Sequence, residues 1–194
     1  MVDKKILRAV QLSTARRIFY VGVYFFLLLT CSGIVFDRYL YFEREILMIA
    51  QLRILTHTEV SAKHLEEMTA LLHILNPSLP PLTRERLDSL GIEGSIVLVA
   101  DNNAGTIVGT ATLIYYYQLA KGRVATIETV VVLSEYRRQG IGTALINRLL
   151  AISKLGGAAN VSLTSNTTRE SAHRLYEHLG FKKRDTYIFR IDLL

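Results

Sequence analysis

The sequence predicts an α/β fold with a mixed central sheet of about six to seven strands and helices on both faces. A hydrophobic helix is expected before it, at residues 18–36. Segments with strand-like and helix-like apolar spacing alternate from residue 50 onward. Short turns join the first long strands, which makes them antiparallel. Helices join the later strands, which makes those strands parallel.

Residues 1–49 divide into a basic leader (1–17), an apolar segment without charge (18–36) and a linker (37–49). A helix of that length can span a hydrocarbon core of about 30 Å, so the segment predicts a membrane helix or signal. An apolar helix docked on the domain is the alternative. Two further readings stay open: a lipoprotein-like cleavage box at Leu28–Cys31, and a translation start at Met48, just before the first strand.

Residues 50–194 predict a single domain, which opens with a short strand at 51–55. An amphipathic helix follows at 58–75, because apolar residues recur at helical spacing until Pro77 interrupts them. A second short helix is expected at 83–90, with Thr83 as its N-cap.

The middle of the chain is rich in β-branched and aromatic residues, which favour strands. Two turns, at residues 102–105 and 121–123, divide it. We therefore expect three consecutive antiparallel strands, at 95–102, 106–120 and 124–133.

The last part predicts a helix at 141–154, a strand at 160–166 and a helix at 167–179. Gly156 and Gly180 follow the two helices, at the position where helices often end on glycine. Further strands are expected within 181–193.

The composition excludes several kinds of site. One cysteine allows neither a disulfide within the chain nor a cysteine-based zinc site, and the five histidines show no metal-binding spacing, so no metal is expected. The formal net charge of +6 suits an acidic ligand, nucleic acid or an anionic membrane. Nucleic acid is not expected, because no basic helix with interleaved aromatic residues is present.

Arg137–Gly142 reads RRQGIG and lies between a predicted strand and a predicted helix. Glycines let backbone N–H groups approach a ligand closely, and the helix directs the positive end of its dipole to the same place. This pattern indicates a phosphate site, although an ordinary turn with solvated arginines remains the alternative. The residues match neither the Walker motif nor the dinucleotide fingerprint.

This stretch, VVVLSEYRRQGIGTAL, resembles the acyl-CoA signature of the GNAT superfamily of N-acetyltransferases, with Arg137, Gly140 and Gly142 at its fixed positions. A second block, SAHRLYEHLGF at 171–181, is similar to the C-terminal motif of the same superfamily. The resemblance covers residues 50–194 and says nothing of 1–47. It implies a GNAT-like fold, and acetyl-CoA as a co-substrate without a metal.

The resemblance also implies where acetyl-CoA lies. Its pyrophosphate is expected on the loop, and its pantetheine arm beside the strand that precedes the loop. The residues implied in cofactor binding are Val130, Val131, Val132, Arg137, Arg138, Gln139, Gly140, Ile141, Gly142, Thr143, Asn166 and Arg169. Many members of the superfamily carry Asn where this chain has Arg169, so Arg169 is expected to contact a CoA phosphate or an anionic acceptor instead.

Two residues are expected to move protons. Glu128 is a carboxylate in an otherwise apolar strand, where burial is costly without a partner or a function. By resemblance it is the general base, directly or through a water molecule. By the same resemblance, Tyr176 corresponds to the tyrosine with which the superfamily protonates the departing thiolate. The alternatives are a structural glutamate and a tyrosine that only packs on the sheet.

The sequence therefore predicts an N-acetyltransferase for a primary amine on a small molecule or a peptide; the alternative is a non-catalytic acyl-CoA-binding or sensing domain. Homodimers are common in the superfamily. We expect the catalytic domain to face the cytoplasm, where acetyl-CoA is found, with a membrane anchor at 18–36. The basic leader conflicts with this topology, because positive charge tends to keep the N-terminus inside and to send the domain across.

Overall fold

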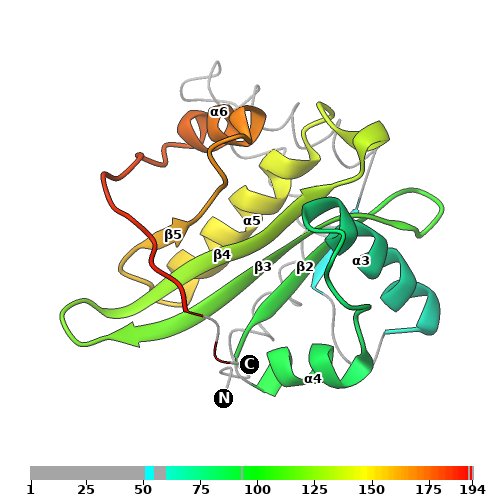
Figure 1. Ribbon diagram of the computed structural model, residues 1–194, viewed down its shortest axis with the longest axis horizontal. Helices are drawn as coiled ribbons and strands as arrows, with labels where there is room; N and C mark the ends of the chain where they lie inside the picture. The colour runs from blue at the N-terminus through cyan, green and yellow to red at the C-terminus, as the bar shows by residue number, and fades with distance from the viewer. Residues whose placement is uncertain (1–50, 55–59, 93, 192, 194) are drawn as a thin grey trace, which may run out of the picture. The chain divides into compact units, whose positions relative to one another are not determined.

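The computed structural model describes residues 51–54, 60–92, 94–191 and 193. The chain divides into two compact units, residues 1–163 and 164–194, which are described separately. The first unit holds a sheet of five strands in the order β1-β2-β3-β4-β5 (Figure 1). The strands are β1 (Gln51–Ile54), β2 (Ile96–Asp101), β3 (Ile107–Gln118), β4 (Gly122–Val132) and β5 (Val161–Leu163).

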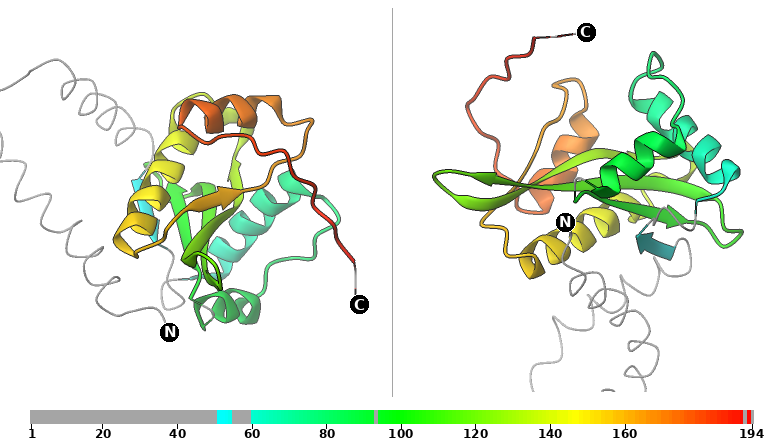
Figure 2. Two further views of the ribbon diagram at one scale, coloured as in Figure 1. Left: turned by 90° about the vertical axis from the view of Figure 1, so that its left-hand side faces the viewer. Right: turned by 90° about the horizontal axis from the view of Figure 1, so that it is seen from below.

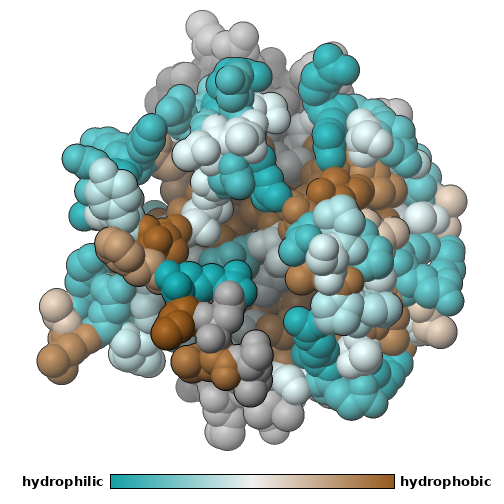
Figure 3. Space-filling model, in the orientation of Figure 1, coloured by the Kyte–Doolittle hydropathy of each residue, from teal (hydrophilic) through white to brown (hydrophobic). Residues whose placement is uncertain are grey.

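The sheet is mixed, as predicted. The first four strands are antiparallel to their neighbours, and β5 runs parallel to β4 after a crossover through a helix. β3 and β4 form the longest hairpin. Figure 3 shows hydrophobic surface at its tip, where Leu119 is fully exposed.

Helices cover both faces of the sheet. α3 (Ala62–Leu75) and α4 (Arg84–Ile92) lie on one face, and α5 (Ile141–Leu155) lies on the other (Figure 2). β2 is buried along its whole length because it is covered from both sides. The prediction of helices on both faces is confirmed.

Two hydrophobic layers hold this unit together. The layer under α3 and α4 contains Val60, Met68, Leu71, Leu87, Val97, Val99, Ile107 and Val131. The layer under α5 includes the fully buried Ile141, Leu145, Leu149 and Ile152 of that helix. These residues recur every three or four positions, so they form one apolar face of α5. The beginning of α5 is thereby fixed on the sheet.

The helix boundaries follow local capping. α3 starts at Ala62, four residues later than predicted position 58, because Ser61 caps it: the Ser61 hydroxyl accepts from the His64 N–H, and His64 Nδ1 accepts from the Ser61 N–H, each at 3.2 Å. Thr83 caps α4 as predicted, accepting from the Arg86 N–H at 3.3 Å.

The second unit holds α6 (Glu170–His178). The strand predicted at 160–166 ends at Leu163, and the helix predicted from 167 begins only at Glu170. The Asn166 side chain explains this difference, since its Oδ1 accepts from both the backbone N–H and the hydroxyl of Thr168. Such a turn competes with both strand and helix.

The strands predicted within 181–193 are not found among the described residues there, and the predicted count of six to seven strands is not confirmed. The side chains of Tyr187, Phe189 and Ile191 are exposed. A strand requires backbone pairing with a neighbour, and these residues pair with none of the strands in the described part of the chain.

The N-terminal predictions at 1–17, 18–36, 37–49 and Met48 lie outside the described residues. Among the residues that are described, no helix is long and apolar enough to cross a membrane.

Candidate active site

The loop that joins β4 to α5 has a conformation that its sequence requires. After a short 3-10 turn, η2 (Ser134–Tyr136), the chain passes through Arg138 at φ +59° and Gly140 at φ +81°. Both residues are left-handed, a region that glycine enters at little cost and that other residues avoid. Gly140 is the N-cap of α5, which explains a glycine at this predicted position.

The first turn of α5 presents backbone donors that the helix itself does not satisfy. Among the residues that the structure describes, no side chain caps this helix end, and its first backbone bond runs from the Ala144 N–H to the Gly140 carbonyl at 2.9 Å. The N–H groups of Ile141, Gly142 and Thr143 therefore have no partner within the helix. Together with the positive end of the helix dipole, they form a site that suits a phosphate group.

The polar side chains of the loop mainly brace it. Arg137 Nε donates to the Val132 carbonyl at 3.0 Å, and Gln139 Nε2 donates to the Glu135 carbonyl at 2.9 Å. The Arg138 side chain is exposed. Hydrogen bonds from its own backbone N–H and from the Ser134 hydroxyl, with a smaller contribution from Arg137, hold the pKa of Glu135 below its usual value. Glu135 thus partly offsets the positive charge of the loop.

β4 contains a bulge that the sequence did not predict. In the register with β3, Thr110 pairs with Val131 and Thr112 pairs with Glu128, so the single residue Ala111 faces both Thr129 and Val130. Thr129 has φ +52°. A β-branched residue rarely adopts this conformation, so a sequence without glycine or asparagine here carries no signal for a bulge.

The bulge coincides with an open strand edge. β5 pairs with β4 only at Ala125, Thr126 and Ile127. From Glu128 to Val132, within the described part of the chain, no strand pairs with β4 on that side. Such an edge can accept an extended ligand as if it were a further strand. The open edge leads directly into the loop and the first turn of α5.

The valines on this edge differ in their surroundings. Val131 is 4% exposed and belongs to the hydrophobic layer under α3, whereas Val130 and Val132 are half-buried. Their side chains are apolar, so a polar ligand on this edge would be bound by their backbone groups.

Glu128 stands at the start of the open edge. It pairs in register with Thr112, and the Thr126 hydroxyl donates to its Oε1 at 3.3 Å. Residues that pair directly share a face of the sheet, and Thr112 also pairs with Val97 of the hydrophobic layer under α3, so Glu128 and Thr112 lie on the face that α3 covers. The carboxylate is half-buried and keeps acceptor capacity for a further donor.

The other predicted residues belong to the second unit. Tyr176 is half-buried on α6, where its ring contacts Phe181 edge-on at 6.0 Å between centroids. Arg169 is the N-cap of α6, and Asn166 forms the turn described above. Glu128, Val130–Val132 and the loop belong to the first unit. Asn166, Arg169 and Tyr176 belong to the second.

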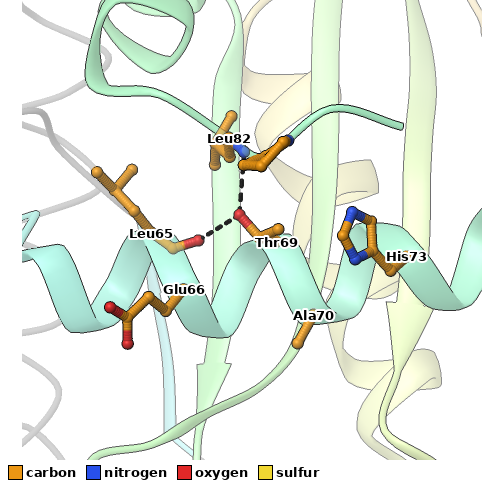
Figure 4. Close-up of a pocket in the computed structure, with 7 residues that line it drawn as sticks. Leu65, Glu66, Thr69, Ala70, His73 and Leu82 are labelled. Atoms are coloured by element: carbon orange, nitrogen blue, oxygen red, sulfur yellow. Dashed lines mark hydrogen bonds between the residues drawn. The ribbon is translucent and has the colours of Figure 1, made fainter. Parts of the chain in front are cut away.

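A shallow pocket lies elsewhere, on the outer side of α3 (Figure 4). Its volume is about 340 Å³, and Thr69 bridges the Leu65 carbonyl and the Leu82 N–H inside it. It includes none of the predicted site residues, whereas the loop and the open edge contain most of them and carry backbone donors that neither the helix nor a neighbouring strand satisfies in the described part of the chain. Among the described residues, no cluster of His, Cys, Asp and Glu could hold a metal ion.

Comparison with known proteins is consistent with this geometry. A glucosamine 6-phosphate N-acetyltransferase of Trypanosoma brucei brucei is 33% identical over 150 residues, which cover 74% of this chain and 95% of the relative. The crystal structure of a Trypanosoma brucei acetyltransferase matches with a TM-score of 0.62 and 33% identity, over 74% of this chain and 99% of that chain.

A more distant structure, an aminoglycoside N-acetyltransferase in complex with CoA, matches with a TM-score of 0.60 at 19% identity, over 75% of this chain and 95% of that chain. At that identity the likeness concerns the fold alone. The model of the acetyltransferase (GNAT) family matches residues 63–181. This chain is therefore a member of the GNAT family of acetyltransferases.

Proposed function

We propose that this protein transfers the acetyl group of acetyl-CoA to a primary amine by direct attack of the amine. The observation that carries this proposal is the continuity of the open edge of β4 with the uncapped first turn of α5. The open edge of β4 suits the amides of a pantetheine arm, and the first turn of α5 suits a pyrophosphate. Family membership supports the same chemistry.

In this proposal the N–H groups from Arg138 to Thr143 hold the pyrophosphate, and the backbone of Val130–Val132 holds the pantetheine arm. Acetyl-CoA supplies the activated acyl group. A backbone N–H on the same edge polarises the thioester carbonyl. In other enzymes, removal of one such donor costs about 3 kcal/mol of transition-state stabilisation.

Glu128 is proposed as the general base. A free alkyl ammonium has a pKa near 10, so the acceptor must lose a proton before it can attack. The half-buried carboxylate lies at the start of the open edge, where the reacting end of a ligand on that edge is expected. The proton passes to Glu128 directly or through a water molecule.

Tyr176 is proposed as the acid that protonates the departing thiolate. Its place on α6, within the block that resembles the C-terminal motif of the family, supports this role. Asn166 and Arg169 are proposed to contact CoA or an anionic acceptor. Since the Asn166 Oδ1 already accepts two hydrogen bonds, we assign its side-chain NH₂ group to the ligand.

We propose an amino sugar phosphate as the first acceptor class to test, because a relative whose match covers 74% of this chain is named for glucosamine 6-phosphate. A peptide amine is the second class. We also propose that the catalytic domain faces the cytoplasm, where acetyl-CoA is available, and that residues 18–36 attach it to a membrane.

The test combines binding with turnover, both measured on the full chain. Acetyl-CoA and CoA are expected to raise the melting temperature, and inorganic phosphate at the same concentration to raise it much less. Thiol release with a panel of amines then measures transfer. Glu128→Gln is expected to lower kcat by about 10²–10⁴ with little change in CoA affinity, and Tyr176→Phe to lower it similarly.

The outcomes separate the two candidate functions. A melting shift with CoA but no thiol release with any amine would favour an acyl-CoA-binding or sensing domain. No shift with acetyl-CoA or CoA would contradict both readings. Transfer that is unaffected by Glu128→Gln would remove Glu128 from the mechanism and leave the activity in place.

A further inference from the structure

A pair of threonine hydroxyls joins the bulge of β4 to the neighbouring strand. The Thr129 hydroxyl donates to the Thr112 hydroxyl oxygen at 2.9 Å. Thr112 is 7% exposed and pairs in register with Glu128, so the bond connects the bulged residue with the residue opposite the proposed base. Both residues lie in the first unit.

The bulge is a conformation that must be held in place. Thr129 has φ +52°, which is unfavourable for a β-branched side chain. Glycine would adopt this conformation at little cost in free energy, but the chain has threonine here. Without a restraint, the return of Thr129 to an extended conformation would lower the conformational free energy of the strand. The hydroxyl bond to Thr112 opposes this return, because an extended Thr129 would point its side chain elsewhere.

We propose that Thr112 is a positioning residue for acetyl transfer: its hydroxyl holds Thr129 in the bulge and thereby fixes the direction of the backbone donors on the open edge. This inference rests on the proposed function. In this inference the buried Thr112 acts through its bond to Thr129 and not by contact with a substrate. If the bulge relaxes, the edge can still bind pantetheine, but the donor for the thioester carbonyl is misplaced.

The neighbouring Thr110 provides a matched control. It lies on the same face of β3 and is 1% exposed, but its hydroxyl donates to the Leu98 carbonyl of β2 at 3.0 Å. Thr110→Val and Thr112→Val therefore remove the same chemical group from the same strand at similar burial. Only Thr112→Val removes the hydrogen bond to Thr129 that holds the bulge.

The experiment uses the full chain and compares wild type, Thr112→Val, Thr112→Ser and Thr110→Val. The readouts are kcat, the KM for acetyl-CoA, the Kd for CoA and the melting temperature. Thr112→Val is expected to lower kcat about tenfold, a fraction of the 10²–10³ lost when an oxyanion donor is removed outright. Its Kd for CoA should stay within about twofold of wild type, because CoA has no carbonyl at the reacting position.

Thr112→Ser keeps the hydroxyl and is expected to retain most of kcat. Thr110→Val should lower the melting temperature about as much as Thr112→Val and leave kcat unchanged. If Thr112→Val does not fold, Thr129→Ala and Thr129→Ser provide the same comparison from the other end of the bond. Equal kcat in the Val variants at positions 110 and 112, or in the two Thr129 variants, would overturn the inference.

Failure of the proposed function has a different signature. If the wild type turns over amines but the hydroxyl variants match their controls, the function stands and the positioning role is wrong. If the wild type binds CoA but transfers nothing, the function fails. In that case the bulge is tested by binding alone, because acetyl-CoA carries the thioester carbonyl and CoA does not. If the ratio of the two affinities is the same in Thr112→Val as in wild type, the inference is overturned.

Discussion

Gly156→Ala is expected to destabilise this protein, although the backbone at Gly156 would accept alanine. Gly156 has φ −77° and ψ 2°, outside the region reserved for glycine. An added Cβ would lie 2.8 Å from Cζ of Tyr115, and nearer still to its Oη. The ring cannot simply swing away, because the Tyr115 hydroxyl donates to the Ile152 carbonyl at 2.9 Å and Arg123 stacks on the ring at 4.2 Å.

The magnitude follows from what the ring would lose. The hydroxyl bond contributes about 1 kcal/mol, the Arg123 stacking about 0.5–1 kcal/mol and forced repacking about 1 kcal/mol or more. Loss of backbone freedom in the unfolded chain returns about 0.4–1 kcal/mol. The net expectation is a loss of about 2 kcal/mol, or roughly 4–8 °C in melting temperature for a chain of this size.

A double-mutant cycle tests this reasoning by the sign of the effect. In a Tyr115→Val background the obstacle is gone, so Gly156→Ala should stabilise by about 0.4–1 kcal/mol. Gly157→Ala serves as the control, because that glycine has φ +71° with open space around it. Its cost should be the same in both backgrounds. Thermal or denaturant unfolding measures all of these variants, and stabilisation by Gly156→Ala in the wild-type background would refute the argument.

Two further predictions concern the loop and the same tyrosine. Gly140→Ala should lower the free energy of unfolding by about 1–2 kcal/mol, because φ at Gly140 is +81°, and Gly140→Asn should cost less; equal melting temperatures for wild type and the Ala variant would contradict this. Burial raises the pKa of Tyr115 above its usual 10.0, so the native state keeps this proton at pH values where the unfolded chain releases it. The advantage of wild type over Tyr115→Phe should therefore be constant below pH of about 10 and shrink above it, as unfolding at a series of pH values would show.

Most of the fold could be predicted because it depends on local signals. Among the described residues of the first unit, apolar spacing, β-branched runs and turn residues located each α-helix and strand to within about four residues, and Thr83 caps α4 as expected. Gly140 was predicted as part of the phosphate loop, and the left-handed conformation found there gives a second reason for glycine at this position. The start of α3 differs from the prediction because the Ser61–His64 capping box fixes it, and histidine stands at the position where such a box usually has Glu or Gln.

What could not be predicted depends on partners distant in the chain. The bulge at Thr129 is held by a hydroxyl on another strand, and threonine by itself argues for a regular strand. The bracing contact of Arg137 was likewise hidden: a loop arginine suggests a phosphate ligand, and nothing in the sequence shows that its Nε also donates to the Val132 carbonyl. Apolar and polar residues alternate within 181–193, as they do in a strand. This pattern does not show whether a neighbouring strand is there to pair with.

The uncapped first turn of α5 has a consequence for the choice among anions. Its positive potential comes from backbone dipoles, which act at contact distance on a group small enough to enter the turn. A cluster of lysines and arginines would attract any polyanion, and its binding would weaken steeply with salt. Recognition through neutral N–H groups should depend much less on ionic strength. A chain of net charge +6 can in this way prefer a compact pyrophosphate to the long polyanions that surround it in a cell.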